Sequence, residues 1–544
     1  MYQSQIVSCL LAFVFAVPCL AGDLEMTLRY QKETSPDSGR YHQLTRQETW
    51  KPSETAIIVC DVWDLHHCQN AVLRAQEFAP RLERVLTTAR EQGVTIIHAP
   101  SGCMNHYAEH PARKRAQLVA PSPTLPDEIT KWCYQIPAEE KGVYPLDQTD
   151  GGEDDEPEQH AKWAAELESR GLNPRAPWSK QTDLLTIDSD KDYISDKGDE
   201  IWSILTAKGI DNVILTGVHT NMCVLGRPFG LRQLSKNGKN VVLMRDMTDT
   251  MYNPGAWPYV SHFTGTDRII SHIEKFVAPT VSSDQLIGGK PFVLQGDDRP
   301  HVVIVMAEAE YETNRTLPKF ASSYLGKDFR VSYCFENDSN RDDIPGLDTA
   351  LSTADVLVLS VRRRALPVKQ MDAVRNYVAS GKPVIGIRTA CHAFSIHGKQ
   401  PPAGTATWEA FDPEVFGGNY HGHFSNKLTS LVEVASAAAD HPILQGISHE
   451  PYTQRGSLYK TSPIVDSAKL LLVGAIEGES QEPVAWTFDR ADGGKSFFTS
   501  LGHKTDFDQP MFQRLVLNSI YWAAGQPIPV EVDFEIPAEP VKKW

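Results

Sequence analysis

The strongest constraint on the fold is an alternation between short, continuously apolar segments and amphipathic helical segments. In the first half the expected strands are 55–64, 94–100, 212–218 and 240–248, and the expected helices are 78–93, 199–210 and 223–238. Strands that are rich in Val, Ile and Leu along their whole length are typically buried on both faces. Their alternation with helices predicts a parallel sheet that helices cover on both sides.

The second half repeats this alternation. Its expected strands are 301–311, 353–361, the beginning of 382–394 and parts of 483–503, and its expected helices are 371–381 and 510–525. We therefore predict an α/β fold with two three-layer domains, each built on a mostly parallel, doubly wound sheet. The 544 residues leave room for two such domains, because a domain commonly has roughly 150 residues.

Composition places the domain boundaries. The expected segments are a signal peptide at 1–22, a first domain at 23–285, a linker at 286–300, a second domain at 301–528 and a tail at 529–544. The first domain contains a long segment, about 101–185, that is rich in proline, glycine and acidic residues and lacks strong periodicity. A segment of this kind is more typical of a functional insertion or lid than of a simple connection.

The chain begins with an apolar run at 6–21 that ends in small residues. The run is shorter than the about 20 residues that a membrane-spanning helix needs. A signal peptide cleaved near Ala21 is therefore favoured over a short membrane anchor. Cleavage would export the protein to the periplasm or the medium and leave no integral membrane segment.

The charge balance restricts the partners. The chain has 53 Lys and Arg residues against 69 Asp and Glu residues, a formal net charge of −16. Nucleic-acid affinity comes mainly from basic side chains, so this excess of acid argues against a nucleic-acid partner. The nine cysteines are too few in so long a chain to form a disulfide scaffold. We expect a small-molecule substrate.

Three ionisable residues of the first half form a candidate catalytic set. Asp61 ends the first strand, Cys223 follows the strand 212–218, and Lys191 precedes the helix 199–210. A cysteine at a helix N-terminus is biased toward the thiolate, and a nearby ammonium would increase that bias. Asp61 would accept the thiol proton as general base. The alternative is that Cys223 is a small buried residue without chemistry.

These motifs resemble the isochorismatase-like cysteine hydrolases, the group that contains nicotinamidases and N-carbamoylsarcosine amidase. The resemblance rests on Asp61 in IIVCDVWD, Lys191 in KDYISD and Cys223 in GVHTNMC, and it covers most of 53–280 outside the insertion. It implies a Rossmann-like sheet and a catalytic triad of Asp61, Lys191 and Cys223. The presence of the cysteine favours cleavage of a C–N bond in a small amide, ureido or related acyl compound, through a thioester intermediate.

The same resemblance implies two backbone features near the cysteine. The peptide bond between Val218 and His219 is expected to be cis. The backbone N–H groups of His219 and Cys223 are expected to form an oxyanion hole for the tetrahedral intermediate.

The first motif departs from the amidase pattern. Trp63, His66 and His67 stand where amidase relatives have a Gln-Asn-Asp-Phe-like run, and with His98 they are expected to line a pocket or pack in the core. Some nicotinamidases bind a metal through an Asp-x-His pair after the second strand, whereas Asp64 and His66 directly follow the first strand. We therefore assign no metal ligands and expect no required cofactor, with a metal site as the weaker alternative.

The second half resembles the ThuA-like (trehalose-utilisation) domains of the class I glutamine amidotransferase-like superfamily. The resemblance rests on VFGGNYHGHF, on DHPILQGI and on the stretch from PVAW to TSLGH. In amidotransferases the nucleophilic cysteine directly follows a Gly-Ile pair, whereas here Arg388 does and Cys391 comes three residues later. A glutamine-hydrolysing triad is therefore not expected. The preferred interpretation is a binding or accessory domain with a polar pocket around Arg388, Cys391, His392 and His503.

The sequence thus leaves three hypotheses. The leading one is an exported cysteine hydrolase with a fused ThuA-like domain. One alternative is a non-catalytic binding protein for a sugar-related ligand, and the other places the chemistry in the second domain, at Cys391 with His503 as base. Isochorismatase-like relatives are commonly oligomeric, so a homo-oligomer is also an expectation.

Overall fold

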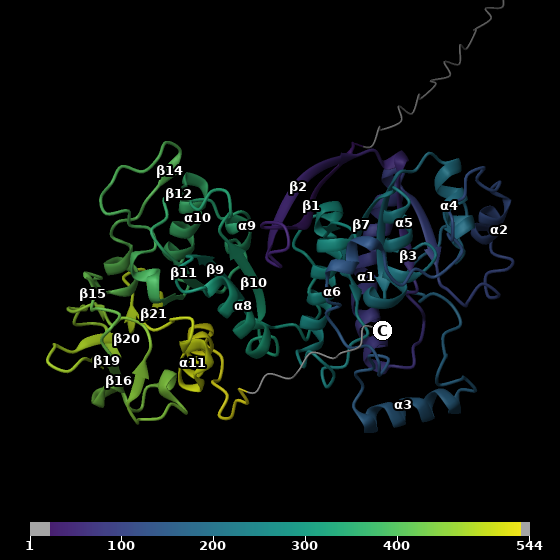
Figure 1. Cartoon of the computed structure of the whole chain (residues 1–544). Helices are drawn as coiled ribbons and strands as arrows, with labels where there is room; N and C mark the ends of the chain where they lie inside the picture. Colours follow the sequence, from purple (N-terminus) through teal and green to yellow (C-terminus); the bar gives the residue numbers. More distant parts are fainter. Residues whose placement is uncertain (1–21, 535–544) are drawn as a thin grey trace, which may run out of the picture.

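The computed structural model describes residues 22–534. The apolar run at 6–21 and the last ten residues of the expected tail lie outside this range. Within it the chain forms two α/β halves, one on a sheet of eight strands and one on a sheet of nine (Figure 1). The predicted α/β class with two sheets is confirmed.

The first sheet has the strand order β2-β1-β8-β7-β6-β3-β4-β5. Six strands are parallel: β3 (Thr55–Cys60), β4 (Thr95–Ala99), β5 (Tyr193–Ile194), β6 (Asn212–Val218), β7 (Asn240–Asp249) and β8 (Thr280–Val281). The remaining two, β1 (Leu24–Glu33) and β2 (Tyr41–Trp50), form an antiparallel hairpin at one edge.

Helices cover both faces of this sheet, because successive residues of its buried strands point to opposite sides. In β3, Ile57 and Val59 pack against α1 (Gln69–Gln92). Ala56 and Ile58 pack in the other core with α4 (Gly198–Ala207), α5 (Leu231–Lys236) and α6 (His262–Phe276). The short helix α7 (Asp284–Ile287) lies beside α1.

The helix predicted at 223–238 is interrupted. Thr220–Val224 form a π-helical turn, and α5 begins only at Leu231. Pro228 lies in the break, and proline can neither donate an intrahelical hydrogen bond nor accommodate the preceding turn. The break positions Arg227 for the site described below.

The hairpin β1–β2 was not expected, since no strand was predicted before residue 55. Its signal is an alternation in β1, where Leu24, Met26 and Leu28 are buried and the residues between them are not. The hairpin also reaches the second half. Strand β2 lies beside β10, and the Thr34 hydroxyl donates to Asp338 (Figure 1).

The second sheet has the order β10-β9-β11-β13-β21-β20-β19-β16-β17. Its parallel part consists of β10 (Arg330–Phe335), β9 (His301–Ala307), β11 (Val356–Val361), β13 (Val384–Ile387) and β21 (Lys495–Thr499). Antiparallel strands extend it: β20 (Glu482–Asp489), β19 (Lys469–Ala475), β16 (Ser430–Val434) and β17 (Tyr452–Gln454). Two small sheets pair β12 (Leu366–Pro367) with β14 (Thr405–Ala406) and β15 (Gly422–His423) with β18 (Tyr459–Lys460).

Helices cover both faces of the second sheet as well. One face carries α8 (Thr313–Tyr324) and α11 (Pro510–Ala524). The other carries α9 (Leu347–Leu351) and α10 (Val368–Ala379). Strand β13 is followed by a 3-10 turn, Arg388–His392.

The long insertion of the first half has its own elements. It contains α2 (Pro111–Leu118), a 3-10 turn at Pro137–Lys141 and α3 (Pro157–Ser169). Among residues 22–534, no helix combines the length and the apolarity needed to cross a bilayer.

Candidate active site

The topology of the first sheet brings two predicted residues together. The chain leaves β3 for β4 and β5 on one side, and then returns to place β6 on the other side of β3. Ligands of open α/β sheets bind outside the carboxyl ends of the strands at such a switch point. Asp61 directly follows β3, Cys223 lies in the turn after β6, and their side chains are within hydrogen-bonding reach.

Asp61 is completely buried and held on both carboxylate oxygens. Its Oδ1 accepts the backbone N–H of Ser101 at 2.7 Å. Its Oδ2 accepts the Nε–H of Arg227 at 3.0 Å and forms an ion pair with Nη2 of the same residue, also at 3.0 Å. Burial raises the pKa of Asp61, and the charge of Arg227 acts against that rise. The residue adopts a left-handed backbone (φ 49°), a strained conformation that concentrates at functional sites. Asp61 is therefore a positioned carboxylate with increased basicity.

Arg227 is a site residue that the sequence analysis missed. It lies four residues after Cys223, and its N–H donates to the Cys223 carbonyl. Its guanidinium lies over the ring of Trp132, 5.3 Å from the centroid. Trp132 also packs against Gly226, where a Cβ would lie 2.5 Å from the indole. The insertion thus covers the guanidinium that holds Asp61.

Lys191 lies elsewhere. Its side chain is exposed in the turn before β5. The neighbouring Asp192 points inward, to Arg90 and His98. Among the described residues, the cation in contact with Asp61 is Arg227 and not the expected Lys191. The loop therefore buries the Asp192 side chain and exposes the Lys191 side chain to solvent.

The thiol of Cys223 is protonated at rest. Burial raises its pKa, the Asp61 carboxylate raises it further, and Arg227 opposes both effects. Cys223 lies in the π-helical turn beside the point where β6 and β3 approach closely. There a Cβ on Gly217 would lie 2.0 Å from the Cys60 carbonyl oxygen, so only glycine fits. Because its pKa is raised, the Cys223 thiol needs a base in contact with it before it can attack, and Asp61 is in that position.

The backbone between β6 and Cys223 has the form that the resemblance implies. The peptide bond between Val218 and His219 is cis. His219 caps the turn, and its carbonyl accepts the N–H groups of Met222 and Val224. The oxyanion hole at His219 and Cys223 stays a prediction.

An aromatic stack borders the site. The rings of Trp63 and Trp178 are stacked with centroids 4.7 Å apart, and the imidazole of His66 lies 5.7 Å from Trp178. His66 also contacts His67 and His219, at 4.1 and 4.8 Å. Burial lowers the pKa of His219 to about 4, so its ring is neutral at neutral pH. Trp178 comes from the insertion, and no sequence signal singled it out.

His98 does not belong to this stack. It is fully buried, and its two ring nitrogens pair with Gln181 and Asp192 at 2.9 and 3.1 Å. Asp64 and His66 also have separate partners: Asp64 accepts N–H groups of Ser179 and Lys180, and His66 accepts the N–H of Cys68. The Asp-x-His pair therefore organises the loop after β3.

Behind His219 lies a buried ion network. Arg74 binds Asp154 through Nη1 and Nη2 and Asp249 through Nε, at 2.8–3.0 Å. His262 contacts the same two carboxylates, at 3.2 and 2.8 Å. Burial opposes the charge of His262, but Asp249 and Asp154 outweigh it and raise its pKa to about 9. The network ties the acidic part of the insertion to α1 and α6.

Among residues 22–534, the side chains that could ligate a metal together are Asp154 and residues near it. Two groups lie close enough, Cys68 with Asp154 and Asp155, and Glu153 with Asp155 and His160. Asp155 already accepts the first N–H groups of α1, at Gln69 and Asn70. These carboxylates thus have structural partners, and we assign no metal to them.

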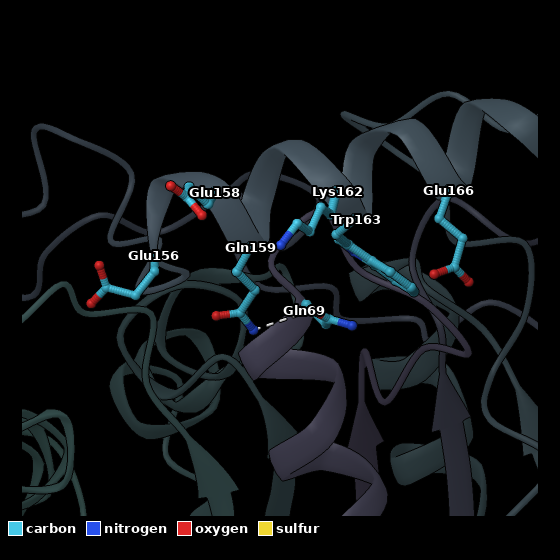
Figure 2. A pocket seen from close by; sticks show the side chains of 7 residues that line it. All are labelled: Gln69, Glu156, Glu158, Gln159, Lys162, Trp163 and Glu166. Atoms are coloured by element: carbon cyan, nitrogen blue, oxygen red, sulfur yellow. Dashed lines mark hydrogen bonds between the residues drawn. The ribbon is translucent and has the colours of Figure 1, made fainter.

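A surface hollow of about 470 Å³ lies between α3 and the start of α1 (Figure 2). Most of its lining side chains come from α3, and Gln159 donates to Gln69 across it. The indole of Trp163 closes one side and donates to the His66 carbonyl. Neither Asp61 nor Cys223 lines this hollow.

The structure also places the candidate residues of the second half. Cys391 is buried, with its sulfur 3.2 Å from Nδ1 of the adjacent His392. His503 pairs its Nδ1 with the Thr505 hydroxyl at 2.8 Å. Within the described residues, the imidazole in contact with Cys391 is therefore His392 and not the proposed base His503. Arg388 directly follows β13, at the elbow position.

Comparison with known families addresses this half directly. Residues 301–523 match the family model ThuA, described as trehalose utilisation. The second half is a ThuA-like domain. In this domain Arg388 directly follows β13, and Cys391 comes three residues later. None of the curated proteins compared with the chain matches it significantly.

The solved structures to which the chain is similar include ThuA-like proteins and proteins of the cysteine hydrolase and isochorismatase type. A ThuA-like protein from Bacteroides uniformis shares 15% identity over 43% of this chain and 95% of its own, with a TM-score of 0.32. A cysteine hydrolase from Pseudomonas syringae pv. phaseolicola shares 16% over 44% and 93%, with a TM-score of 0.26. An isochorismatase family protein from Burkholderia thailandensis shares 14% over 43% and 93%, with a TM-score of 0.24. Similarity at this level assigns no activity.

Proposed function

We propose that the first half is a cysteine hydrolase that cleaves a C–N bond of a small amide, ureido or related acyl compound. The observation that carries the proposal is the contact of the Cys223 thiol with the buried Asp61 carboxylate at the switch point of the sheet. A nucleophile paired with a base that a third group orients is the arrangement expected for covalent catalysis. Here the third group is Arg227.

Asp61 is the general base and the general acid in every step of this mechanism. It takes the thiol proton as the Cys223 sulfur attacks the acyl carbon, and a tetrahedral oxyanion forms. It then returns that proton to the leaving nitrogen as the C–N bond breaks, which leaves a thioester. In the second stage Asp61 takes a proton from water, the hydroxide adds to the thioester, and the thiol leaves with the proton. A guanidinium remains protonated at neutral pH, so Arg227 holds Asp61 and transfers no proton.

The aromatic stack supports a planar acyl substrate. Trp63 and Trp178 present flat rings beside the site, and the histidines next to them are neutral at neutral pH because burial lowers the pKa of His66 and His219. We further propose that the mature chain acts outside the cytoplasm, on the strength of the apolar run at 6–21.

The test is a hydrolysis screen of primary amides, ureido acids and nicotinamide. Wild type, Cys223→Ala and Cys391→Ala are compared, the last being a matched control with another buried thiol. We expect turnover in wild type and Cys391→Ala, and a loss of at least about a hundredfold in Cys223→Ala. Turnover that survives in Cys223→Ala and disappears in Cys391→Ala would place the chemistry in the ThuA-like domain.

A further inference from the structure

Two arginines at neighbouring strand ends of the ThuA-like domain have a left-handed backbone. Arg363 follows β11 by two residues and has φ 52°, and Arg388 directly follows β13 and has φ 48°. Strands β11 and β13 are adjacent and parallel, so both arginines lie at the same edge of the sheet. Non-glycine residues in this conformation are strained and are found more often than average at catalytic and binding sites.

This edge is the switch point of the second sheet. The chain leaves β9 for β10 on one side and then places β11 on the other. Ligands of open α/β sheets bind outside such a point. Tyr311 comes from the segment after β9, and the Arg388 guanidinium lies over its ring, 4.1 Å from the centroid.

Neither arginine forms an ion pair with a carboxylate within residues 22–534. Arg388 is only 1% exposed, donates to the carbonyl oxygens of Ser500 and Ser457, and keeps its Nε without a partner. Arg363 is half-buried and donates to the Ser395 carbonyl. The carboxylate whose charge acts on Arg388 is that of Asp506, which forms no ion pair with it. A buried cation is costly unless anions compensate it, so a bound anion would stabilise these two arginines.

The surroundings are electropositive and aromatic. Burial lowers the pKa of His392 to about 3, and the positive charges of Arg363, Arg362, His397 and Arg388 lower it further. The ring of Tyr420 lies 4.5 Å from His392 and 4.8 Å from Tyr459. Tyr459 also lies under the Arg388 guanidinium, at 4.7 Å. Flat rings of this kind suit the C–H faces of a sugar.

We propose that this edge of the ThuA-like domain binds a small anionic carbohydrate, a sugar that carries a carboxylate or a phosphate. Arg363 and Arg388 bind the charged group, since a guanidinium matches the paired oxygens of both anions. Tyr311, Tyr420 and Tyr459 contact the sugar ring. The site lies in the second sheet and does not depend on the hydrolase proposed for the first.

Isothermal titration calorimetry of the whole chain tests the proposal. The probes are D-glucuronate, D-glucose 6-phosphate, D-glucose and inorganic phosphate. We expect one of the two charged sugars to bind once per chain, and D-glucose and inorganic phosphate to bind at least about tenfold more weakly. The stronger charged sugar tells whether the site takes a carboxylate or a phosphate.

Two variants connect the binding to the arginines. Arg363→Gln removes a half-buried charge and is expected to weaken binding of the charged sugar at least about tenfold. Arg375→Gln makes the same change on α10 and is expected to bind like wild type. Thermal melting confirms that both variants are folded. Absence of binding by both charged sugars, equal affinity for D-glucose, or wild-type affinity in Arg363→Gln would overturn the proposal.

Discussion

Replacing Arg227 by methionine tests the site most informatively, because it removes the cation from Asp61 and keeps much of the side-chain volume. Asp61 is completely buried, Arg227 donates from Nε to its Oδ2 at 3.0 Å, and Nη2 of Arg227 lies 3.0 Å from the same oxygen as an ion pair. The variant loses this hydrogen bond and the ion pair, and leaves the carboxylate with the Ser101 N–H and the Cys223 thiol. Asp61 must then remain as an unpaired buried charge or bind a proton.

The size of the effect follows from burial. Two unit charges about 4 Å apart attract by about 4 kcal/mol at an effective dielectric constant of about 20. Loss of one partner of a buried pair typically costs about 3–5 kcal/mol. The Arg227 side chain is 26% exposed, and solvent screening reduces the figure. We expect the free energy of unfolding at pH 7 to fall by about 2–3 kcal/mol.

The assay is urea denaturation of Arg227→Met, with Lys191→Met as the matched control. Lys191 is exposed, so its substitution is expected to change the free energy of unfolding by less than about 0.5 kcal/mol. A double-mutant cycle with Asp61→Asn separates the pair from other effects, because Arg227→Met should cost much less in that background. A larger loss in Lys191→Met than in Arg227→Met would refute the assignment of Arg227 as the partner of Asp61.

Two further predictions concern residues that support the site, His262 in the buried ion network and Gly217 at the end of β6. The pKa of His262 is raised to about 9 from 6.5, so its stabilising contribution is complete below pH 6.5 and is lost as the pH rises through 9. This shift corresponds to about 3 kcal/mol of stability. The fall in the free energy of unfolding between pH 6.5 and 9, measured by urea denaturation, should therefore be much smaller in His262→Gln than in wild type. Identical pH profiles of the two proteins would contradict this. Gly217→Ala should destabilise by at least about 3 kcal/mol in urea denaturation, since its Cβ would meet the Cys60 carbonyl at 2.0 Å with φ 105°. Gly238→Ala is the control, because φ is 84° but no atom lies within 4 Å, and an equal cost of the two changes would show that the contact is unimportant.

The buried strands could be predicted from the sequence because their apolar runs allow few other structures. The segment 212–218 is the whole of β6, and 240–248 is β7 apart from its last residue. Once these strands are parallel, Asp61 and Cys223 must meet at the same edge. Their proximity therefore follows from local patterns and one rule of topology.

The cation of the site could not be predicted in the same way. The helix pattern continued through 223–238, whereas Pro228 breaks it and Arg227 turns onto Asp61. A spacing of four residues after Cys223 was the available signal, since such residues share a helix face. Lys191 lies in a loop, where local sequence does not determine which of two neighbouring side chains points inward.

In the acidic insertion, long-range contacts and not local composition determine where the side chains lie. Its run of acidic residues is typical of a solvated segment, yet Asp154 and Asp155 are taken up by Arg74 and by the first amides of α1. Long-range ion pairs of this kind leave no mark in the local sequence. The segment contributes to the frame behind His219 through the same network.

The central claim is that Cys223 is a nucleophile that Asp61 activates. The most direct measurement is acylation by p-nitrophenyl acetate, followed by intact-mass and peptide-mapping mass spectrometry of wild type and Asp61→Asn. The account predicts an acetyl group on Cys223 of wild type in samples quenched with acid during the first turnover, before water hydrolyses the thioester. Acylation is expected to be at least about a hundredfold slower in Asp61→Asn because the buried thiol has lost its base. Acetylation of Cys391 with Cys223 unmodified, or an unchanged rate in Asp61→Asn, would contradict it.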